Sequence, residues 1–220
     1  MQPAEGIRFI HAAICREVVE LEDQAAVAES PEQLAALDQR LASFAQIVIL
    51  HGEGEEASIY PAIETKLRAV GAAYLHDHQD EKALFADLRA KIAAARAASG
   101  ATRAGALAKV RRQAIALTEH LTPHVHKEDA LITPLLCELF TPPEQGAQIG
   151  QMMGVFPPDV MARTLPWLVG HLTPDDRVSY MMMLERALPP ERFAGACGWI
   201  RGGVAADVWA GVTARVPGLS

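Results

Sequence analysis

The sequence is poor in cysteine and contains no apolar run long enough to span a membrane. Its 220 residues include three cysteines, which are widely separated and form no CxxC pair. This number and spacing argue against a disulfide framework or a thiolate zinc site, and they favour a reducing compartment. The first residues also lack the basic and apolar regions of a signal peptide. We therefore expect a soluble, cytoplasmic protein.

The sequence also has few aromatic residues and no excess of positive charge. Only 5% of the residues are aromatic, and no segment alternates apolar and polar residues with a period of two, so strands are not expected. The formal net charge of -7 argues against nucleic acid and an anionic membrane surface as partners. Half of the residues are hydrophobic and alanine is abundant, which favours a large core of closely packed helices.

Cap and turn residues divide the first part of the chain into four long helices. Ser30, Pro31 and Gln33 form a capping box with proline at the first helical position, and Gly71 and the Ser99-Gly100 pair mark later breaks. Short connections between long helices are typical of an all-α, up-down-up-down four-helix bundle, here over residues 1–140. The predicted helices cover roughly residues 4–28, 31–69, 72–98 and from the Ser99-Gly100 turn to about 140, with a bend at Pro123.

Residues 141–220 have a different pattern and are predicted to form a helical C-terminal appendage that packs on or extends the bundle. Three cap-plus-proline starts, at Thr141, Thr173 and Pro189, indicate shorter helices. Metal-ligating residue types are nearly absent here, so a second catalytic domain is not expected. The appendage carries all three tryptophans: Trp167, Trp199 and Trp209.

One motif occurs twice in the bundle. His51 to Pro61 and His124 to Pro134 both read His-x3-Glu, then a second acid, then Ile and Pro at the same spacing. Histidine at position i and glutamate at i+4 share one face of a helix, one turn apart. A neutral imidazole and a carboxylate placed in this way can bind one divalent metal ion or reach two adjacent ones.

A lone histidine precedes each copy of the motif. His11 lies 40 residues before His51, and His78 lies 46 residues before His124. This arrangement is consistent with two related helical hairpins around a pseudo-twofold axis. Two such hairpins supply what a dinuclear metal site inside a helix bundle needs.

The two motifs and the lone histidines resemble the hemerythrin-like, or HHE cation-binding, domain over about residues 5–138. The resemblance implies two iron ions joined by an oxo or hydroxo bridge, with both glutamates bridging the irons. Manganese and zinc are weaker alternatives for this mixture of imidazole and carboxylate. The positions that match the ligands of the family are His11, His51, Glu55, His78, His124 and Glu128.

The third helix departs from the pattern of oxygen-carrying hemerythrins. In those proteins a fifth histidine lies four residues from the lone histidine of this helix, whereas His78 has Tyr74 and Lys82 at that spacing. Either Tyr74 or His120, one turn before His124, is a candidate for the vacant ligand position. This departure argues against simple reversible oxygen carriage.

Other polar residues near the motifs are expected outside the metal shell. His76 and His126 each lie two positions from a matched histidine, so they cannot share its helix face and should be solvated. Glu53, Glu56 and Asp129 should lie at the surface or behind the ligands.

The surroundings of the centre are predicted to be apolar. His171, before the cap at Thr173, is explained as a helix-end residue stabilised by the dipole. Side chains one turn from the ligands should shield the metals from bulk water, namely Ile7, Ile14, Ile47, Val48, Leu121 and Leu131.

The appendage has a weaker resemblance of its own. Arg163 to Trp167 and Gly198-Trp199-Ile200 are similar to helical segments beside the hemerythrin domains of plant iron-sensing ubiquitin ligases of the BRUTUS type. A cover of short helices that buries tryptophan and methionine explains the same residues equally well. No cysteine-rich zinc segment is present, so ligase activity does not follow.

The sequence is consistent with two functions of different classes. The first is a non-haem diiron protein that binds or reacts with a small oxidant, namely oxygen, peroxide or nitric oxide. The second is a regulatory module that senses iron or oxygen and contacts a protein partner through residues 141–220. The sequence leaves open whether the protein is an enzyme.

Overall fold

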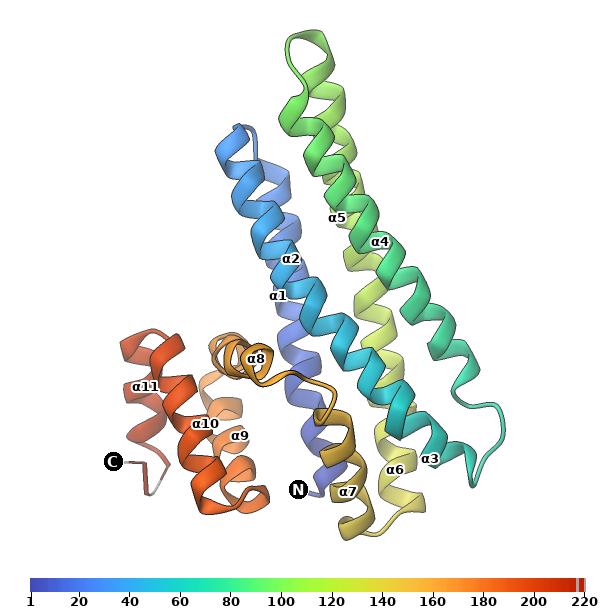
Figure 1. The fold of residues 1–220 in the computed structure, drawn as a ribbon, viewed down its shortest axis with the longest axis vertical. Coiled ribbons are helices and arrows are strands. Elements are labelled where there is room, and N and C mark those ends of the chain that lie inside the picture. Colours follow the sequence, from blue (N-terminus) through green and yellow to red (C-terminus); the bar gives the residue numbers. More distant parts are fainter. Residues whose placement is uncertain (217, 220) are drawn as a thin grey trace.

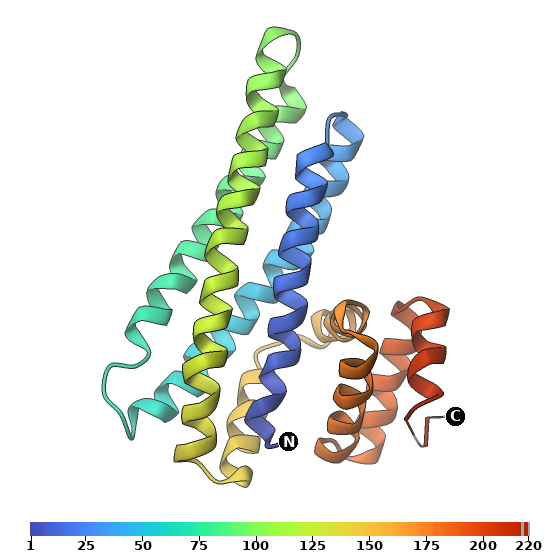
Figure 2. The same cartoon turned by 180° about the vertical axis from the view of Figure 1, so that it is seen from behind.

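Four long helices form two antiparallel hairpins that lie side by side in the computed structural model (Figures 1 and 2), which describes residues 1–216 and 218–219. Helix α1 packs against α5, and α2 packs against α4. The predicted all-α, up-down-up-down bundle is therefore confirmed, and no strand occurs among the described residues. A short 3₁₀ turn, η1 (Pro3–Gly6), precedes the helices α1 (Ile7–Val27), α2 (Pro31–Gly54), α4 (Ala72–Ala97) and α5 (Ala101–Lys127).

The predicted caps begin and end these helices. The Ser30 hydroxyl accepts a hydrogen bond from the Gln33 amide at 3.1 Å, and the Gln33 side chain accepts one from the Ser30 amide at 2.9 Å. Gly100, between α4 and α5, has a φ of 55°, a backbone conformation that favours glycine. The second helical segment is shorter than predicted, because its last helix, α3 (Tyr60–Glu64), is followed by turns, and Gly71 caps the start of α4 instead.

Both copies of the repeated motif contain a π-helical turn. In η2 (Glu55–Ile59) the Tyr60 amide donates to the Glu55 carbonyl, and in η3 (Glu128–Ile132) the Thr133 amide donates to the Glu128 carbonyl. A proline follows each turn inside the next short helix, where its missing amide and its ring disfavour a regular α-helical pattern. The predicted fourth helix thus changes from α-helical to π-helical hydrogen bonding after Lys127. Pro123, where a bend was predicted, lies within α5. The last helix of the bundle is α6 (Thr133–Leu139).

The C-terminal residues form two groups of helices around the bundle. The first, α7, packs against η1, η2 and α2, and the close approach depends on Gly54, whose added Cβ would lie 2.7 Å from the Met152 carbonyl oxygen. The second group shares a hydrophobic core with Phe9 and Ala13 of α1 and stands beside the bundle in both views. The first group is α7 (Pro142–Met153) alone. The second group is α8 (Pro158–His171), α9 (Pro174–Ala187), α10 (Pro190–Gly203) and α11 (Ala206–Thr213).

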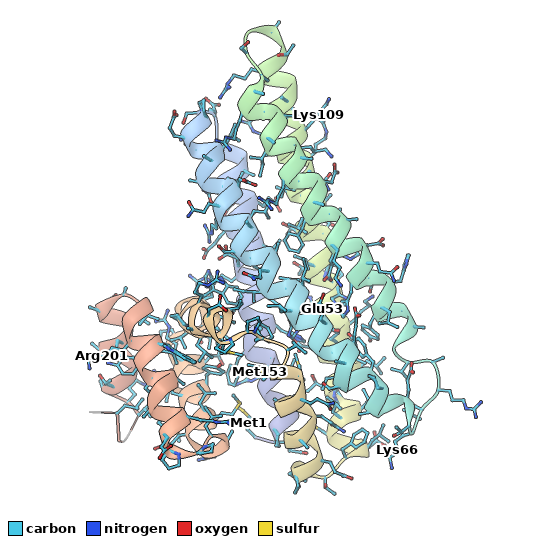
Figure 3. All side chains as sticks on the ribbon, viewed as in Figure 1. Met1, Glu53, Lys66, Lys109, Met153 and Arg201 are labelled. Atoms are coloured by element: carbon cyan, nitrogen blue, oxygen red, sulfur yellow. The ribbon has the colours of Figure 1, made fainter. Side chains whose placement is uncertain are left out.

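The bundle core is divided into two apolar clusters. Ile14 of α1 belongs to the larger cluster, toward the α1–α2 and α4–α5 turns, and Ile7 belongs to the smaller cluster beside α3, α6 and α7. His11 lies between them on the same helix, so a polar layer separates the two clusters. Figure 3 labels Glu53 on α2 near this layer and Lys109 near the far end of α5. Among the described residues, no helix is long and apolar enough to cross a membrane.

A buried ion-pair network joins the appendage to the bundle. Glu17 of α1 accepts a hydrogen bond from Arg40 Nε at 2.6 Å, and its Oε2 lies 2.7 Å from His171 Nε2 and 3.3 Å from Trp167 Nε1. His171 does lie in the last turn of α8, as predicted, but its ring also pairs with a carboxylate of another helix. The sequence alone gave no sign of this pairing, because the partners are more than 150 residues apart.

Glu17→Gln is expected to destabilise the protein by about 2 kcal/mol, because Arg40 and His171 lose a buried partner. Burial raises the pKa of Glu17, but hydrogen bonds from His171 and Arg40 outweigh it and lower the pKa to about 2. The pKa of His171 is raised, since its contacts with Glu17 outweigh burial. The lowered pKa of Glu17 stabilises the folded protein above about pH 4.5. The raised pKa of His171 stabilises it below about pH 6.5.

The difference in unfolding free energy between the two proteins should therefore be largest between these pH values. Urea unfolding from pH 3 to 8 measures it. Asp23→Asn, an exposed change on the same helix, is the matched control. Equal stability of wild type and Glu17→Gln at every pH would contradict the network's role.

Candidate metal centre

The structure brings the six predicted metal-site residues together in the polar layer of the bundle. They come from all four long helices and the two π-turns, and each is at most 4% exposed. The Nε2 atoms of His11 and His51 lie 3.0 Å apart, and the rings of His78 and His124 have centroids 4.9 Å apart. The histidines therefore form two pairs, each made of the lone histidine and the motif histidine of one hairpin.

The two glutamates lie between the histidine pairs and offer one oxygen to each. Glu55 Oε1 is 3.5 Å from His51 Nε2, while Glu55 Oε2 is 3.6 Å from His78 Nε2. Glu128 Oε2 is 3.5 Å from His11 Nε2, while Glu128 Oε1 is 3.5 Å from His124 Nε2. A carboxylate that faces two sets of imidazole nitrogens is arranged to join two ions.

Carboxylates behind three of the histidines fix the orientation of the rings. Asp129 lies 2.7 Å from His11 Nδ1, and Glu56 lies 3.0 Å from His78 Nδ1. In both motif copies the second acid thus reaches the lone histidine of the other hairpin. A carboxylate on Nδ1 holds the proton there and leaves the Nε2 lone pair for a metal.

A third such contact was missed in the sequence. Asp77 Oδ2 lies 3.2 Å from His124 Nδ1, and the Lys127 ammonium also binds this carboxylate. Asp77 directly precedes His78, and nothing in its spacing from His124 indicated the contact. Within the described part of the chain, His51 Nδ1 has no hydrogen-bond partner.

The donor groups fit divalent cations better than they fit each other. Among the described residues, Glu55 Oε1, Glu81 Oε1 and Glu128 Oε2 are buried without a hydrogen-bond partner. Burying unpaired carboxylates costs several kcal/mol unless a counter-charge is present. Burial and the neighbouring Glu128 and Glu81 charges raise the pKa of Glu55 well above its usual value. Cations in place of protons would remove this conflict.

The environments of two of the histidines, His51 and His124, favour the form that metals require. Burial lowers the pKa of His51 well below its usual value, with further contributions from the neighbouring histidines. Burial also lowers the pKa of His124. Neutral imidazole is the metal-binding form of histidine, so these environments favour ligation.

Glu81 is a buried site residue that sequence reasoning missed. It lies three residues after His78 on α4, and one atom each of His78, Glu81 and His124 fall within 4.8 Å of one another. The candidates predicted for the vacant ligand position were Tyr74, four residues before His78, and His120, one turn before His124. Positions i and i+3 also share a helix face, and this spacing is the signal that could have found Glu81.

Neither candidate for the vacant ligand position provides a donor to the centre. The Tyr74 ring stacks on Tyr60 with centroids 5.5 Å apart and packs edge-on against His124 at 6.0 Å. His120 Nε2 lies 3.1 Å from the Asp77 carbonyl oxygen and is occupied by that contact. The fifth position is therefore not taken by either side chain.

Tyr60 reaches the centre in place of Tyr74. Its hydroxyl donates to Glu128 Oε1 and lies 3.5 Å from both Glu55 Oε2 and His78 Nε2. Burial and the charges of Glu55 and Glu128 raise its pKa, which keeps the phenol protonated. The residue is part of the repeated motif, but the π-turn, which adds a residue to the helical turn, brings it to the same face as Glu55.

The π-turns also change the predicted apolar wall. Ile7, Ile14, Ile47, Val48 and Leu121 are buried as predicted. Leu131 was wrongly placed in this wall, because its side chain is 47% exposed and Ile132 is buried instead. The extra residue per turn in η3 shifts the helix face by one position.

Near the centre, one glycine allows close packing of the helices, and three polar residues lie at the surface. An added Cβ at Gly52 would lie 3.0 Å from His78 Nδ1, so the glycine lets α2 approach this imidazole. His76 and His126 are exposed, as predicted, and Glu53 pairs with Lys82 at the surface. These three residues lie outside the centre.

Comparison with known proteins gives a family and several relatives. The profile of the Hemerythrin HHE cation binding domain matches residues 2–136. The chain is similar to Zinc finger protein BRUTUS of Arabidopsis thaliana, with 25% identity over 194 residues, which is 86% of this chain and 15% of the relative. Two BRUTUS-like zinc finger proteins of the same plant are each 24% identical, over 83% and 85% of this chain. The chain spans only about 15% of the length of the first two relatives. No solved structure matches the chain significantly.

Proposed function

The chain belongs to the hemerythrin HHE cation-binding domain family, and on that premise we propose that it is a non-haem diiron protein that binds or reacts with oxygen, peroxide or nitric oxide. The observation that carries this proposal is the division of the Glu55 and Glu128 oxygens between two histidine pairs. One ion would be held by His11 and His51 and the other by His78 and His124. Both glutamates would bridge them.

Iron suits this donor set. Imidazole and carboxylate ligands together are typical of iron sites in helix bundles, with manganese and zinc as alternatives to be separated by metal analysis. When bound by these residues, iron would supply the electrons that reduce a small oxidant. The chain's own contribution is to exclude bulk water and to hold the ligands in place.

Tyr60 adds a proton donor at the centre. Its hydroxyl hydrogen-bonds Glu128, and its raised pKa retains the proton on the phenol oxygen. The hydrogen bond from Tyr60 thus stabilises the negative charge on Glu128. The Tyr74 ring stacks on the Tyr60 ring, with centroids 5.5 Å apart.

We predict that the diferrous protein reacts with oxygen or peroxide and ends diferric, without reversible release of oxygen. The centre has four matched histidines where an oxygen carrier has five, and the negative charges of its buried carboxylates favour the ferric state. Stopped-flow absorbance of anaerobically reduced protein measures the reaction. Tyr60→Phe should change the rate or the spectrum, whereas Tyr74→Phe, its matched control, should change them less. Full recovery of the diferrous spectrum under vacuum would contradict the proposal and favour a carrier.

A second function is favoured by the extent of the similarity to the plant relatives. The match covers 86% of this chain, so it includes part of the C-terminal helices beyond the family profile at residues 2–136. This extent supports a module that senses iron or oxygen and contacts a protein partner through residues 141–220. Hydrogen exchange of α8 to α11 that changes with iron loading would favour the sensor over an enzyme.

A further inference from the structure

The pseudo-twofold symmetry of the centre is broken at one helix. Relative to its lone histidine, α4 carries Glu81 at the third position, whereas α1 carries Ile14 at the third position after His11. Ile14 is 1% exposed and belongs to the apolar core. The two halves of the centre therefore offer different donors, although their repeated motifs are the same.

In the part of the chain that the structure describes, Glu81 has no partner outside the centre that would account for its burial. It is 3% exposed, its Oε1 has no hydrogen-bond partner among the described residues, and this oxygen lies 3.5 Å from His124 Nε2. The two nearby lysines are engaged elsewhere, since Lys127 binds Asp77 and Lys82 pairs with Glu53 at 3.4 Å. An ionised carboxylate buried in this position would be stabilised by a cation at the centre.

From this placement we infer that Glu81 is a metal ligand of one ion only, the ion held by His78 and His124. The inference rests on the proposed diiron function. That ion then has five protein donors: His78, His124, Glu81 and one oxygen each from Glu55 and Glu128. The other ion has four, because Ile14 offers none. The two ions are therefore unequal in donor number and in the charge around them.

The inequality has a thermodynamic consequence. Loss of Glu81 removes a donor and a negative charge from one ion, while both bridging glutamates and all four histidines remain. Binding at the His78–His124 position should weaken selectively, and binding at the His11–His51 position should change little. Ten- to hundredfold losses of affinity are typical even for groups behind metal ligands, so at least a tenfold loss is expected here.

Anaerobic titration of the metal-free full-length protein with ferrous ion tests the inference. Wild type should bind two ions, and Glu81→Gln and Glu81→Ala should bind one ion with unchanged affinity and the second at least tenfold more weakly. Glu53→Gln, which removes an exposed glutamate near the same layer, is the matched control and should titrate like wild type. Glu81→Asp, with a shorter carboxylate, should recover part of the affinity.

Circular dichroism and thermal melting of the metal-free variants separate ligation from folding. Without metal, Glu81→Gln removes a buried carboxylate that has no partner, so this variant should be at least as stable as metal-free wild type. Two ions bound with wild-type affinities in both Glu81→Gln and Glu81→Ala would overturn the inference. Fewer than two ions in wild type would overturn the diiron proposal itself.

Discussion

Replacing Glu128 with Ala is expected to remove both metal ions from the protein. Its two carboxylate oxygens face His11 on one side and His124 on the other, so the proposed bridge contributes to both positions at once. Its loss also leaves the two ions without part of the negative charge that offsets their repulsion. Metal content of the purified variant should fall from about two ions per chain to well under one.

Glu55→Ala should have the same effect, because Glu55 also divides its oxygens between the two histidine pairs. His76→Ala and His126→Ala are the matched controls, since both histidines are exposed next to a proposed ligand, and both variants should keep their metal. Retention of one tightly bound ion in either glutamate variant would show that the carboxylates do not bridge.

Removal of the metal from the wild-type protein is expected to lower the melting temperature strongly. Without cations, three buried carboxylate oxygens have no partner among the described residues. A ligand present at about a thousand times its dissociation constant stabilises the folded state by about 4 kcal/mol. For a protein of this size that corresponds to a shift on the order of 10 °C.

Differential scanning calorimetry with and without chelator measures this shift. The Glu128→Ala variant is the control, because a protein that has already lost its metal should melt at the same temperature in both conditions. Equal melting temperatures of the wild-type protein with and without chelator would argue against a buried metal site.

The sequence predicted the layout of the fold, and together with the family resemblance it predicted that six residues lie close together, because much of both depends on local rules. Helix caps such as Ser30 and the i, i+4 spacing of His51 and Glu55 act within one or two turns. Because the motif occurs twice, the second hairpin could be predicted by analogy with the first. Long helices joined by short turns leave few alternative arrangements.

The residues that sequence reasoning missed depend on features that single spacings do not reveal. Leu131 was misplaced and Tyr60 was missed because the π-turns add a residue, which rotates the helix faces that follow Glu55 and Glu128. Asp77 orients a histidine on another helix, and Glu17 pairs with a residue of the appendage, so both depend on tertiary packing. Close approach between helices also explains glycines that have no role in a single helix.

Metal analysis combined with Mössbauer spectroscopy of protein loaded with ⁵⁷Fe tests the central claim most directly, because it reports both the number of ions and their coupling. The proposed centre predicts about two irons per chain, magnetically coupled in the oxidised state, with two distinct signals from the unequal donor sets. A single uncoupled ion per chain, or a full complement of mononuclear zinc at one His-x3-Glu pair, would contradict a dinuclear centre at His11, His51, Glu55, His78, His124 and Glu128.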